Sequence, residues 1–145
     1  MLLIVCGAAA AVWVVRQNHS HNDCAAVEQL GHQWIAMAKS VTALENGGAE
    51  HEDLIAIADK ESSMSEAIRA AAGSVASQAL KDQLEKWAQG TALLAKSQRD
   101  SANSPPQLKQ SPSEDVDYYR AAVMTHEATA ALLRACPNMP RVPPS

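Results

Sequence analysis

The stretch DCAAVEQLGHQWIAMAKSVTAL, residues 23–44, decides the fold, because its apolar residues recur at gaps that alternate between three and four. That spacing places them on one face of an α-helix, as packing in a helical bundle requires. The apolar positions are Val27, Leu30, Trp34, Met37, Val41 and Leu44. Asn22 or Asp23 is a suitable N-cap, and the pair Gly47-Gly48 is typical of a helix end. We therefore expect a first helix that begins near Asp23 and ends just before the two glycines.

Three further segments repeat this pattern, over residues 50–74, 76–100 and 113–136. Their periodic faces read Leu54, Ile57, Glu61, Met64, Ile68 and Ala71, then Leu80, Leu84, Trp87, Thr91 and Leu94, and finally Val116, Tyr119, Val123, His126, Ala130 and Leu133. Ser63 and Glu66 match a capping box, which leaves a helix break just before them open. Alanine, the best helix former, is abundant, and aromatic residues make up only 3% of the chain. The composition therefore favours helices over strands.

Proline-rich segments lie between and after the predicted helices. Residues 101–112 contain three prolines and are expected to form a long exposed loop. Residues 137–145 contain four prolines and are expected to form an extended, disordered tail. Short connections between the first three helices make neighbours antiparallel. The predicted fold class is all-α: an N-terminal membrane anchor helix, then an up-down-up-down four-helix bundle over residues 23–136, closed by a disulfide.

The chain begins with a run of non-polar residues, 2–15, in which no Lys or Arg occurs. Its length lies between the apolar core of a signal peptide and the roughly 20 residues of a full membrane span. The residues that follow lack the small side chains that a signal peptidase needs. An uncleaved signal-anchor over residues 1–16, followed by a juxtamembrane linker over 17–22, is therefore favoured. Lipidation of Cys6 is the weaker alternative, because Val5 stands where a small residue is required.

Two cysteines near the ends of the predicted bundle indicate a disulfide. In an up-down-up-down topology the start of the first helix and the end of the last lie together, which brings Cys24 close to Cys136. Disulfides persist in oxidising compartments, so this bridge predicts an extracytoplasmic body in the periplasm or cell envelope. Arg16 favours the opposite orientation by the positive-inside rule, but a single arginine is the weaker signal. The alternative is that the cysteines are small buried hydrophobes of a cytosolic domain.

Glu61 and His126 interrupt otherwise apolar helix faces. The helical rise places both at about 15 Å from the cysteine end of the bundle. Trp34 and Trp87 fall at a similar height, so a buried polar layer of the four residues is geometrically possible. Such a layer would be a proton-sensitive or ligand-binding site, because a nearby carboxylate raises the pKa of a histidine. The favoured alternatives are that the polar pair sets the register of the helices, or that one or both side chains lie in water at the edge of the face.

His19 and His21 are weak metal-ligand candidates that precede Cys24, and a solvated linker is the favoured interpretation of this segment. The sequence contains no HExxH, CxxC, nucleophile-elbow or glycine-rich phosphate-binding motif, so neither an enzyme nor a cofactor is expected. The net charge is −4, with no basic cluster. That charge argues against nucleic acid as a partner.

The leading hypothesis is a non-catalytic interaction module or accessory subunit in the cell envelope, with the membrane and another protein as its partners. Residues 101–112 and 137–145 are the segments expected to contact that protein. The alternative is a sensor-like bundle that binds a small ligand or a metal. A membrane helix followed by a four-helix extracytoplasmic domain is similar to the ligand-sensing domains of some bacterial receptors. That resemblance is one of architecture, and it implies the fold rather than the function.

Overall fold

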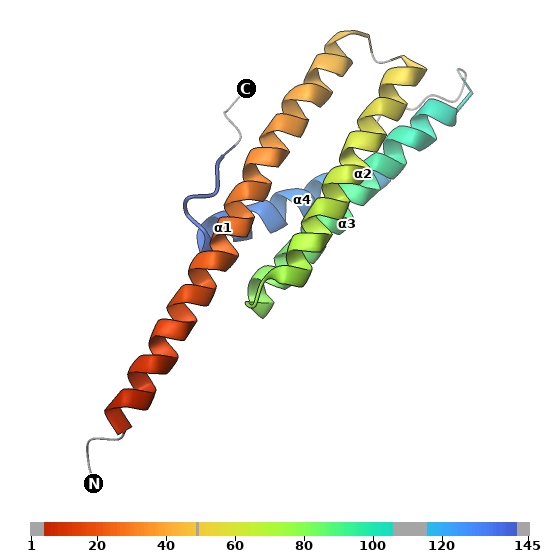
Figure 1. Cartoon of the computed structure of the whole chain (residues 1–145). Helices are drawn as coiled ribbons and strands as arrows, with labels where there is room; N and C mark the ends of the chain where they lie inside the picture. The colour runs from red at the N-terminus through yellow and green to blue at the C-terminus, as the bar shows by residue number, and fades with distance from the viewer. Residues whose placement is uncertain (1–4, 49, 106–115, 142–145) are drawn as a thin grey trace.

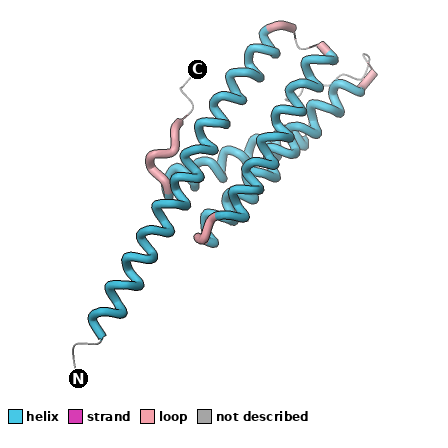
Figure 2. The backbone as a smooth tube through the Cα atoms, in the orientation of Figure 1, coloured by secondary structure: helices cyan, strands magenta, loops and turns pink. Residues whose placement is uncertain are grey.

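The computed structural model describes residues 5–48, 50–105 and 116–141, with side chains from Asn22 onward. Within these residues the chain is all-α and contains no strand (Figures 1 and 2). The four helices are α1 (Val5–Asn46), α2 (His51–Ser74), α3 (Gln78–Asn103) and α4 (Val116–Ala135). The prediction of four helices without strands is confirmed for the part of the chain that the structure describes.

Contacts between neighbouring helices show that they run in opposite directions. Ser65 Oγ on α2 donates a hydrogen bond to the carbonyl oxygen of Ala88 on α3, at 2.8 Å. Near the other end of this pair, His51 Nδ1 lies 2.9 Å from the carbonyl oxygen of Ala102. Helices α3 and α4 are antiparallel by the same criterion, through the ion pairs Lys86–Glu127 and Lys96–Asp117. Helices α2, α3 and α4 therefore alternate in direction along the chain.

The hydrophobic core fills the part of the bundle nearest the two cysteines. Its fully buried side chains include Val27, Ile68, Leu84, Trp87, Leu132 and Cys136. Burying a large apolar side chain stabilises a fold by about 1.5–3 kcal/mol, so these residues hold all four helices together. A Cys24–Cys136 disulfide joins α1 to the end of α4 at the edge of this core, with 5.3 Å between the Cα atoms. The predicted pairing of these two cysteines is confirmed.

Helix α1 is longer than the sequence predicts, because it begins at Val5 instead of near Asp23. Residues 17–22, expected as a linker, lie within it and contain neither Gly nor Pro to end a helix. Asp23 does not cap its own helix. Its carboxylate is buried and accepts hydrogen bonds from the backbone N–H groups of Ala76 and Ser77, at 2.9–3.1 Å. These groups lie at the start of α3, where a negative charge also complements the helix dipole.

Replacement of this carboxylate is expected to loosen the contact between α1 and the start of α3. Asp23→Ala leaves the two backbone N–H groups without their partner and should lower the free energy of unfolding by about 1–3 kcal/mol. The matched control is Glu85→Ala, which removes an exposed carboxylate from α3 and should change stability by less than about 0.5 kcal/mol. Urea unfolding of the two variants measures the difference, and equal stability would show that the Asp23 contacts contribute nothing.

The buried face of α4 differs from the predicted one. Its buried residues are Ala121, Thr125, Ala128 and Leu132, whereas the expected positions Val116, Tyr119 and Val123 are exposed. The reason lies on α3, where Gly90 allows the two helices to approach closely. A Cβ atom at Gly90 would lie 2.5 Å from Thr125 Oγ1 and 3.1 Å from the Ala121 carbonyl oxygen. Only small side chains fit at such a contact, so the small face of α4 turns inward.

Gly90→Ala therefore tests the packing of α3 on α4. The added methyl group must displace the α4 backbone, and overpacking of this kind costs about 1–3 kcal/mol. Gly73→Ala is the matched control, because it adds the same group near the end of α2 where no atom lies within 4 Å. This control should instead stabilise the protein by up to about 1 kcal/mol through helix propensity. Thermal unfolding of both variants should give shifts of opposite sign, and a stabilising Gly90→Ala would contradict this packing.

The first residues after α4 are packed against α1, contrary to the prediction of a disordered tail over 137–145. Met139 is buried in the core, with 4% of its surface exposed. A Cβ atom on Gly31 of α1 would lie 2.7 Å from Pro140 Cδ, so the glycine makes room for this segment. The disulfide at Cys136 brings the chain to this place. Residues 142–145 of the tail lie outside the described residues.

Several other sequence-based boundaries have a clear outcome. Helix α2 shows no break near Ser63, whose hydroxyl donates to the carbonyl oxygen of Asp59 at 2.9 Å. Helix α3 continues through residues 101–103, which were predicted as loop, and residues 106–112 lie outside the described part. Residues 1–4 of the predicted anchor also lie outside it. Among the residues that the structure describes, no helix combines the length and the apolarity needed to cross a bilayer.

Candidate functional site

Glu61 lies inside the bundle, near the middle of α2, with 5% of its surface exposed. One turn after it, Ser65 contacts the Ala88 carbonyl oxygen of α3. Two residues before it, Asp59 Oδ1 accepts a hydrogen bond from Arg99 Nη2 of α3, at 3.0 Å. These two contacts place the Glu61 carboxyl group between the levels of Ala88 and Arg99. The sequence-based prediction that Glu61 interrupts the buried face of its helix agrees with this burial.

The environment of Glu61 favours the neutral form of its carboxyl group. Burial is the largest effect and, together with the negative charge of Glu45, raises its pKa to about 8, while Arg99 acts in the opposite direction. The pKa of Tyr118 on α4 is raised as well, mainly by burial and then by Glu45 and Glu61. In both groups burial is the largest cause, and the negative charge of Glu45 adds to it. A buried carboxyl group of this kind can hold a proton at neutral pH or bind a cation.

Four buried polar atoms in the described side chains have no hydrogen-bond partner. They are Glu61 Oε2, Trp87 Nε1, Gln98 Oε1 and Thr125 Oγ1. Buried polar groups without partners are rare in folded proteins, and each one costs about 1–3 kcal/mol. Sequence reasoning did not identify Gln98 or Thr125. The signal for Gln98 was present, because it follows Thr91 by seven residues on the buried face of α3.

Trp34 and Trp87 meet across the interior, as their similar heights in the sequence-based geometry suggest. Their ring centroids are 5.4 Å apart and their planes are inclined at 67°, which is an edge-to-face arrangement. Trp87 is fully buried, whereas Trp34 is half-buried and packs against the edge of the core. The contact joins α1 to α3 on the disulfide side of Glu61.

His126 does not join the predicted polar layer, because its side chain is exposed on the outer face of α4. The rotation of α4 explains this difference, since the neighbouring Thr125 faces Gly90 of α3 instead. The adjacent Glu127 pairs with Lys86, which places His126 beside the level of Trp87 and not that of Glu61. Of the two polar residues only Glu61 lies in the interior, which agrees with the alternative that one of these side chains lies in water.

The weak metal candidates His19 and His21 lie within α1, in the part whose side chains the structure does not describe. Cys24, the third member of that segment, is held in the disulfide. Among the described side chains, no group of three or more His, Cys, Asp or Glu residues is arranged to hold a metal ion.

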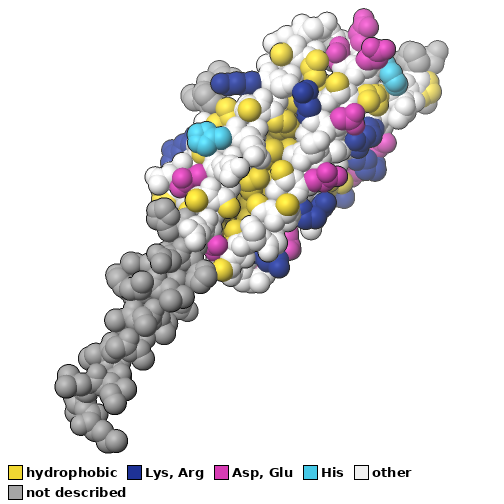
Figure 3. All heavy atoms as spheres, viewed as in Figure 1, with side chains coloured by type: hydrophobic (Ala, Val, Ile, Leu, Met, Phe, Trp, Pro, Cys, Tyr) yellow, Lys and Arg dark blue, Asp and Glu magenta, His cyan; other side chains and the backbone are white. Residues whose placement is uncertain are grey.

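A groove runs between α1 and α2 on the outside of the bundle. Its volume is about 700 Å³, and its lining includes Met37, Ser40, Lys60, Ser63 and Met64. Figure 3 shows apolar side chains gathered along the middle of the same face, with charged side chains to either side. Met64 both lines the groove and belongs to the buried core. The floor of the groove therefore touches the core at Met64, and Glu61 is not part of its lining.

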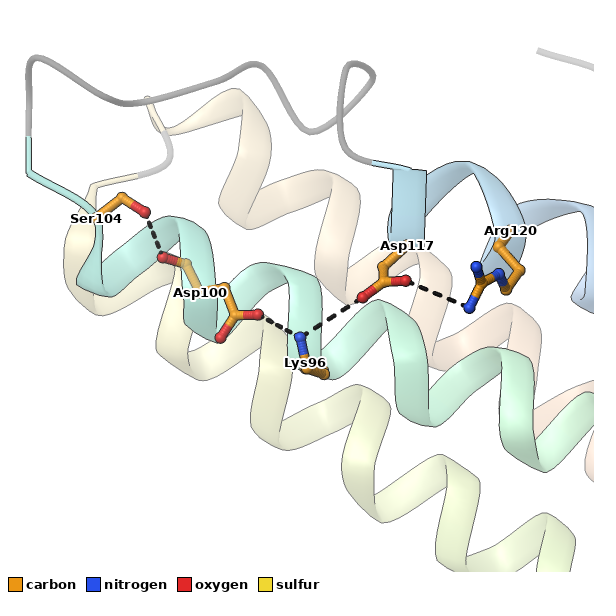
Figure 4. Close-up of polar contacts among 5 residues, drawn as sticks. All are labelled: Lys96, Asp100, Ser104, Asp117 and Arg120. Atoms are coloured by element: carbon orange, nitrogen blue, oxygen red, sulfur yellow. Dashed lines mark hydrogen bonds and ion pairs between the residues drawn. The ribbon is translucent and has the colours of Figure 1, made fainter.

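Ion pairs connect the end of α3 to the start of α4 (Figure 4). Lys96 Nζ lies 2.6 Å from Asp100 and 3.6 Å from Asp117, and Asp117 also lies 3.6 Å from Arg120. The pKa of Lys96 is raised, first by its hydrogen bond with Asp100. These side chains are largely exposed, so each pair contributes little to stability. Their role is to join the first turn of α4 to α3, through the pair Lys96–Asp117.

Comparison of this chain with protein families, with curated proteins and with solved structures finds no match in any of the three.

Proposed function

We propose that this protein is a membrane-anchored, extracytoplasmic helical bundle that acts as a non-catalytic interaction module. The observation that carries the proposal is an exposed apolar stripe on α4. Val116, Tyr119 and Val123 have 71%, 69% and 37% of their surfaces exposed and stand at positions i, i+3 and i+7. Large apolar side chains exposed at this spacing are typical of a helix face that packs against another helix. The proposed partner is therefore a helix of a second protein in the cell envelope.

The shape of α1 supports the membrane part of this proposal. Its N-terminal part extends away from the other three helices (Figure 1). Asp23 is the first residue of α1 whose described side chain contacts the body. The helix before it combines an apolar part, residues 5–15, with a polar part, residues 16–22. At about 1.5 Å per residue the apolar run over residues 2–15 would be roughly 21 Å long as a helix, against roughly 30 Å for the hydrocarbon core of a bilayer. The proposal therefore rests on an apolar run at the free end of α1, with the polar part between it and the body.

The disulfide supports the proposed location of the body. Cys24 and Cys136 lie on the body side of the apolar run, and a bridge between them persists only in an oxidising compartment. The bridge also fixes the base of the proposed anchor to the end of α4, so that a load on α1 is transmitted to the helix with the exposed stripe. An accessory subunit that holds a partner at the membrane needs such a connection.

Site-specific photo-cross-linking in the native cells tests the interaction. A benzophenone amino acid at position 119, in place of Tyr119, should form one discrete adduct with a protein partner. The same amino acid in place of Glu66, an exposed residue of α2, should form none. The double substitution Val116→Asp and Val123→Asp should remove the adduct without changing the melting temperature, since both side chains are exposed. Equal adducts from both positions, or an adduct that survives the double substitution, would contradict the proposed partner surface.

The location is tested separately. The full-length protein should remain in the membrane fraction after alkaline carbonate extraction, and a phosphatase reporter fused to its C-terminus should be active only if the body is exported. Release by carbonate would refute the anchor, and an inactive reporter would refute the exported body. Neither result would by itself refute the partner surface on α4.

A further inference from the structure

A second groove lies over α3, between α2 and α4, and borders the exposed stripe. Among its described lining residues are three basic side chains and no acidic one, although the whole chain has a net charge of −4. We propose that the partner of the stripe is an amphipathic helix with acidic side chains along one flank, and that this groove binds them. The inference rests on the proposed partner surface and specifies the chemistry of the partner.

The groove combines an apolar lining with positive charge. Its volume is about 540 Å³, and three different helices contribute to it. Each of these helices supplies one of the basic residues. The apolar residues are Ala92, Leu93 and Met124, and the basic ones are Arg69 from α2, Lys96 from α3 and Arg120 from α4.

The groove follows the same two turns of α4 as the stripe. At one end Lys96 pairs with Asp117 near the start of α4, and at the other end Met124 adjoins the last residue of the stripe. Between these ends, Arg120 lies four residues after the first stripe residue and three before the last. Residues at these spacings are neighbours on a helix surface. A helix that packs on the stripe therefore has the groove along its flank.

The cations of the groove are accessible to a partner's carboxylates. Arg69 is exposed and has no ion pair among the described residues. Lys96 and Arg120 both point toward Asp117 (Figure 4), and each lies 3.6 Å from it. Exposed pairs of this kind are weak, so they do not prevent further carboxylates from binding. Guanidinium groups bind carboxylates through two parallel hydrogen bonds, which suits Arg69 and Arg120 to Asp or Glu side chains.

The combination of stripe and groove favours a helix over other anionic partners. A free anion would meet only exposed cations, whose attraction is screened by salt. Nucleic acid needs a broad basic surface, which a chain of net charge −4 with three cations in this groove does not offer. A helix brings its carboxylates to the groove while its apolar face covers the stripe. Complementary charges at the rim of such an interface also fix its register and exclude wrong partners.

Charge reversal in the groove tests the inference in the native cells. With the benzophenone amino acid at position 119, Arg69→Glu combined with Arg120→Glu should lower the adduct yield by at least about tenfold, because the partner's carboxylates then face like charges. Both side chains are exposed, so the melting temperature should not change. The matched control combines Lys39→Glu with Lys60→Glu, two exposed positions outside this groove, and should leave the yield unchanged.

The cross-linked peptides supply an independent readout. Mass spectrometry should map the adduct at position 119 to a partner segment with Asp or Glu within one helical turn of the attachment site. The same photoreactive residue in place of Gln89, which lines the groove, should capture the same partner, whereas in place of the exposed Gln78 it should capture none.

The outcomes separate this inference from the proposed function. The acidic helix would be overturned, and the partner surface kept, by an adduct at position 119 that survives the double reversal or maps to a segment without acidic residues. Failure of position 89 to capture the partner that position 119 captures would have the same meaning. Absence of any adduct at position 119 in the protein without these reversals would refute the partner surface itself, and the acidic helix with it.

Discussion

Loss of the Cys24–Cys136 bridge is expected to lower the free energy of unfolding by roughly 2–4 kcal/mol. The bridge joins residues 112 positions apart, so its removal frees a very long loop in the unfolded chain. It also removes a covalent tie between α1 and the rest of the body. The double variant Cys24→Ala and Cys136→Ala tests this without leaving a thiol that can pair wrongly. Urea unfolding of the full-length protein, followed by circular dichroism, measures the change.

The loss of stability caused by removing the bridge should also be uneven along the chain. Apart from the bridge, α1 is held to the body by the Asp23 contacts, by buried Val27 and Leu30, and by the Trp34–Trp87 contact. Hydrogen exchange should therefore accelerate first over residues 24–46 and only later in α2 and α3. Cys6→Ala is the control, since the sequence places Cys6 outside the bridge, and it should leave both measurements unchanged. A double variant as stable as the wild type, or a uniform acceleration of exchange, would contradict this role of the bridge.

The stability of the protein is expected to fall as the pH rises from about 4.5 to about 8, the interval between the ordinary and the raised pKa of Glu61. In this interval the unfolded chain has lost the Glu61 proton while the folded protein keeps it. Folding in this interval therefore takes up a proton, so the free energy of unfolding falls as the pH rises. Below this interval Glu61 is protonated in both the folded and the unfolded protein, and above it Glu61 is ionised in both. Its contribution to the pH dependence of stability is therefore confined to the interval. Each pKa unit corresponds to about 1.4 kcal/mol, so the total effect is a few kcal/mol.

Glu61→Gln should remove this slope, because glutamine does not ionise. The variant should be less sensitive to pH than the wild type and, near pH 8, more stable by about 1 kcal/mol or more. Glu66→Gln is the matched control, since it removes an exposed carboxylate from the same helix and retains the background titration of the other groups. Chemical unfolding at a series of pH values gives the comparison. Parallel curves for the wild type and Glu61→Gln would show that Glu61 does not keep its proton in the folded protein.

The sequence predicts the packing of α1 to α3 well, because their apolar residues leave only one face that can be buried. Val27, Leu30, Ile57, Ile68 and Leu84 all lie in the core, as the periodic spacing requires. The disulfide could be predicted for a related reason. Alternating helix directions bring the two ends of the bundle together whatever the details of the side-chain packing, so the pairing of the cysteines follows from topology alone.

The orientation of α4 could not be predicted from its apolar residues. Both of its faces carry hydrophobic side chains, and the choice between them depends on a close approach to α3 at Gly90. Small residues such as Ala121 and Thr125 are therefore buried against α3, and Tyr119 is exposed, although the tyrosine is the more hydrophobic side chain. This rotation also removes His126 from the interior. A glycine within an otherwise regular helical pattern was the available signal, since it marks a place where another backbone comes near.

Long-range polar contacts account for the other differences. Asp23 is a normal N-cap residue by type, and nothing near it in the sequence shows that its carboxylate caps α3 instead. From the proline-rich composition around them, Met139 and Pro140 are expected to belong to a disordered tail, but the disulfide brings them to Gly31. In each case the deciding partner lies more than 50 residues away along the chain, beyond the reach of local patterns.

Disulfide mapping of the full-length protein, isolated from its native membranes under non-reducing conditions with free thiols blocked, tests the central claim most directly. We expect a peptide pair linked through Cys24 and Cys136, which would establish the closed bundle and its oxidising compartment together. Free thiols at both positions would contradict both the closed bundle and the proposed extracytoplasmic location.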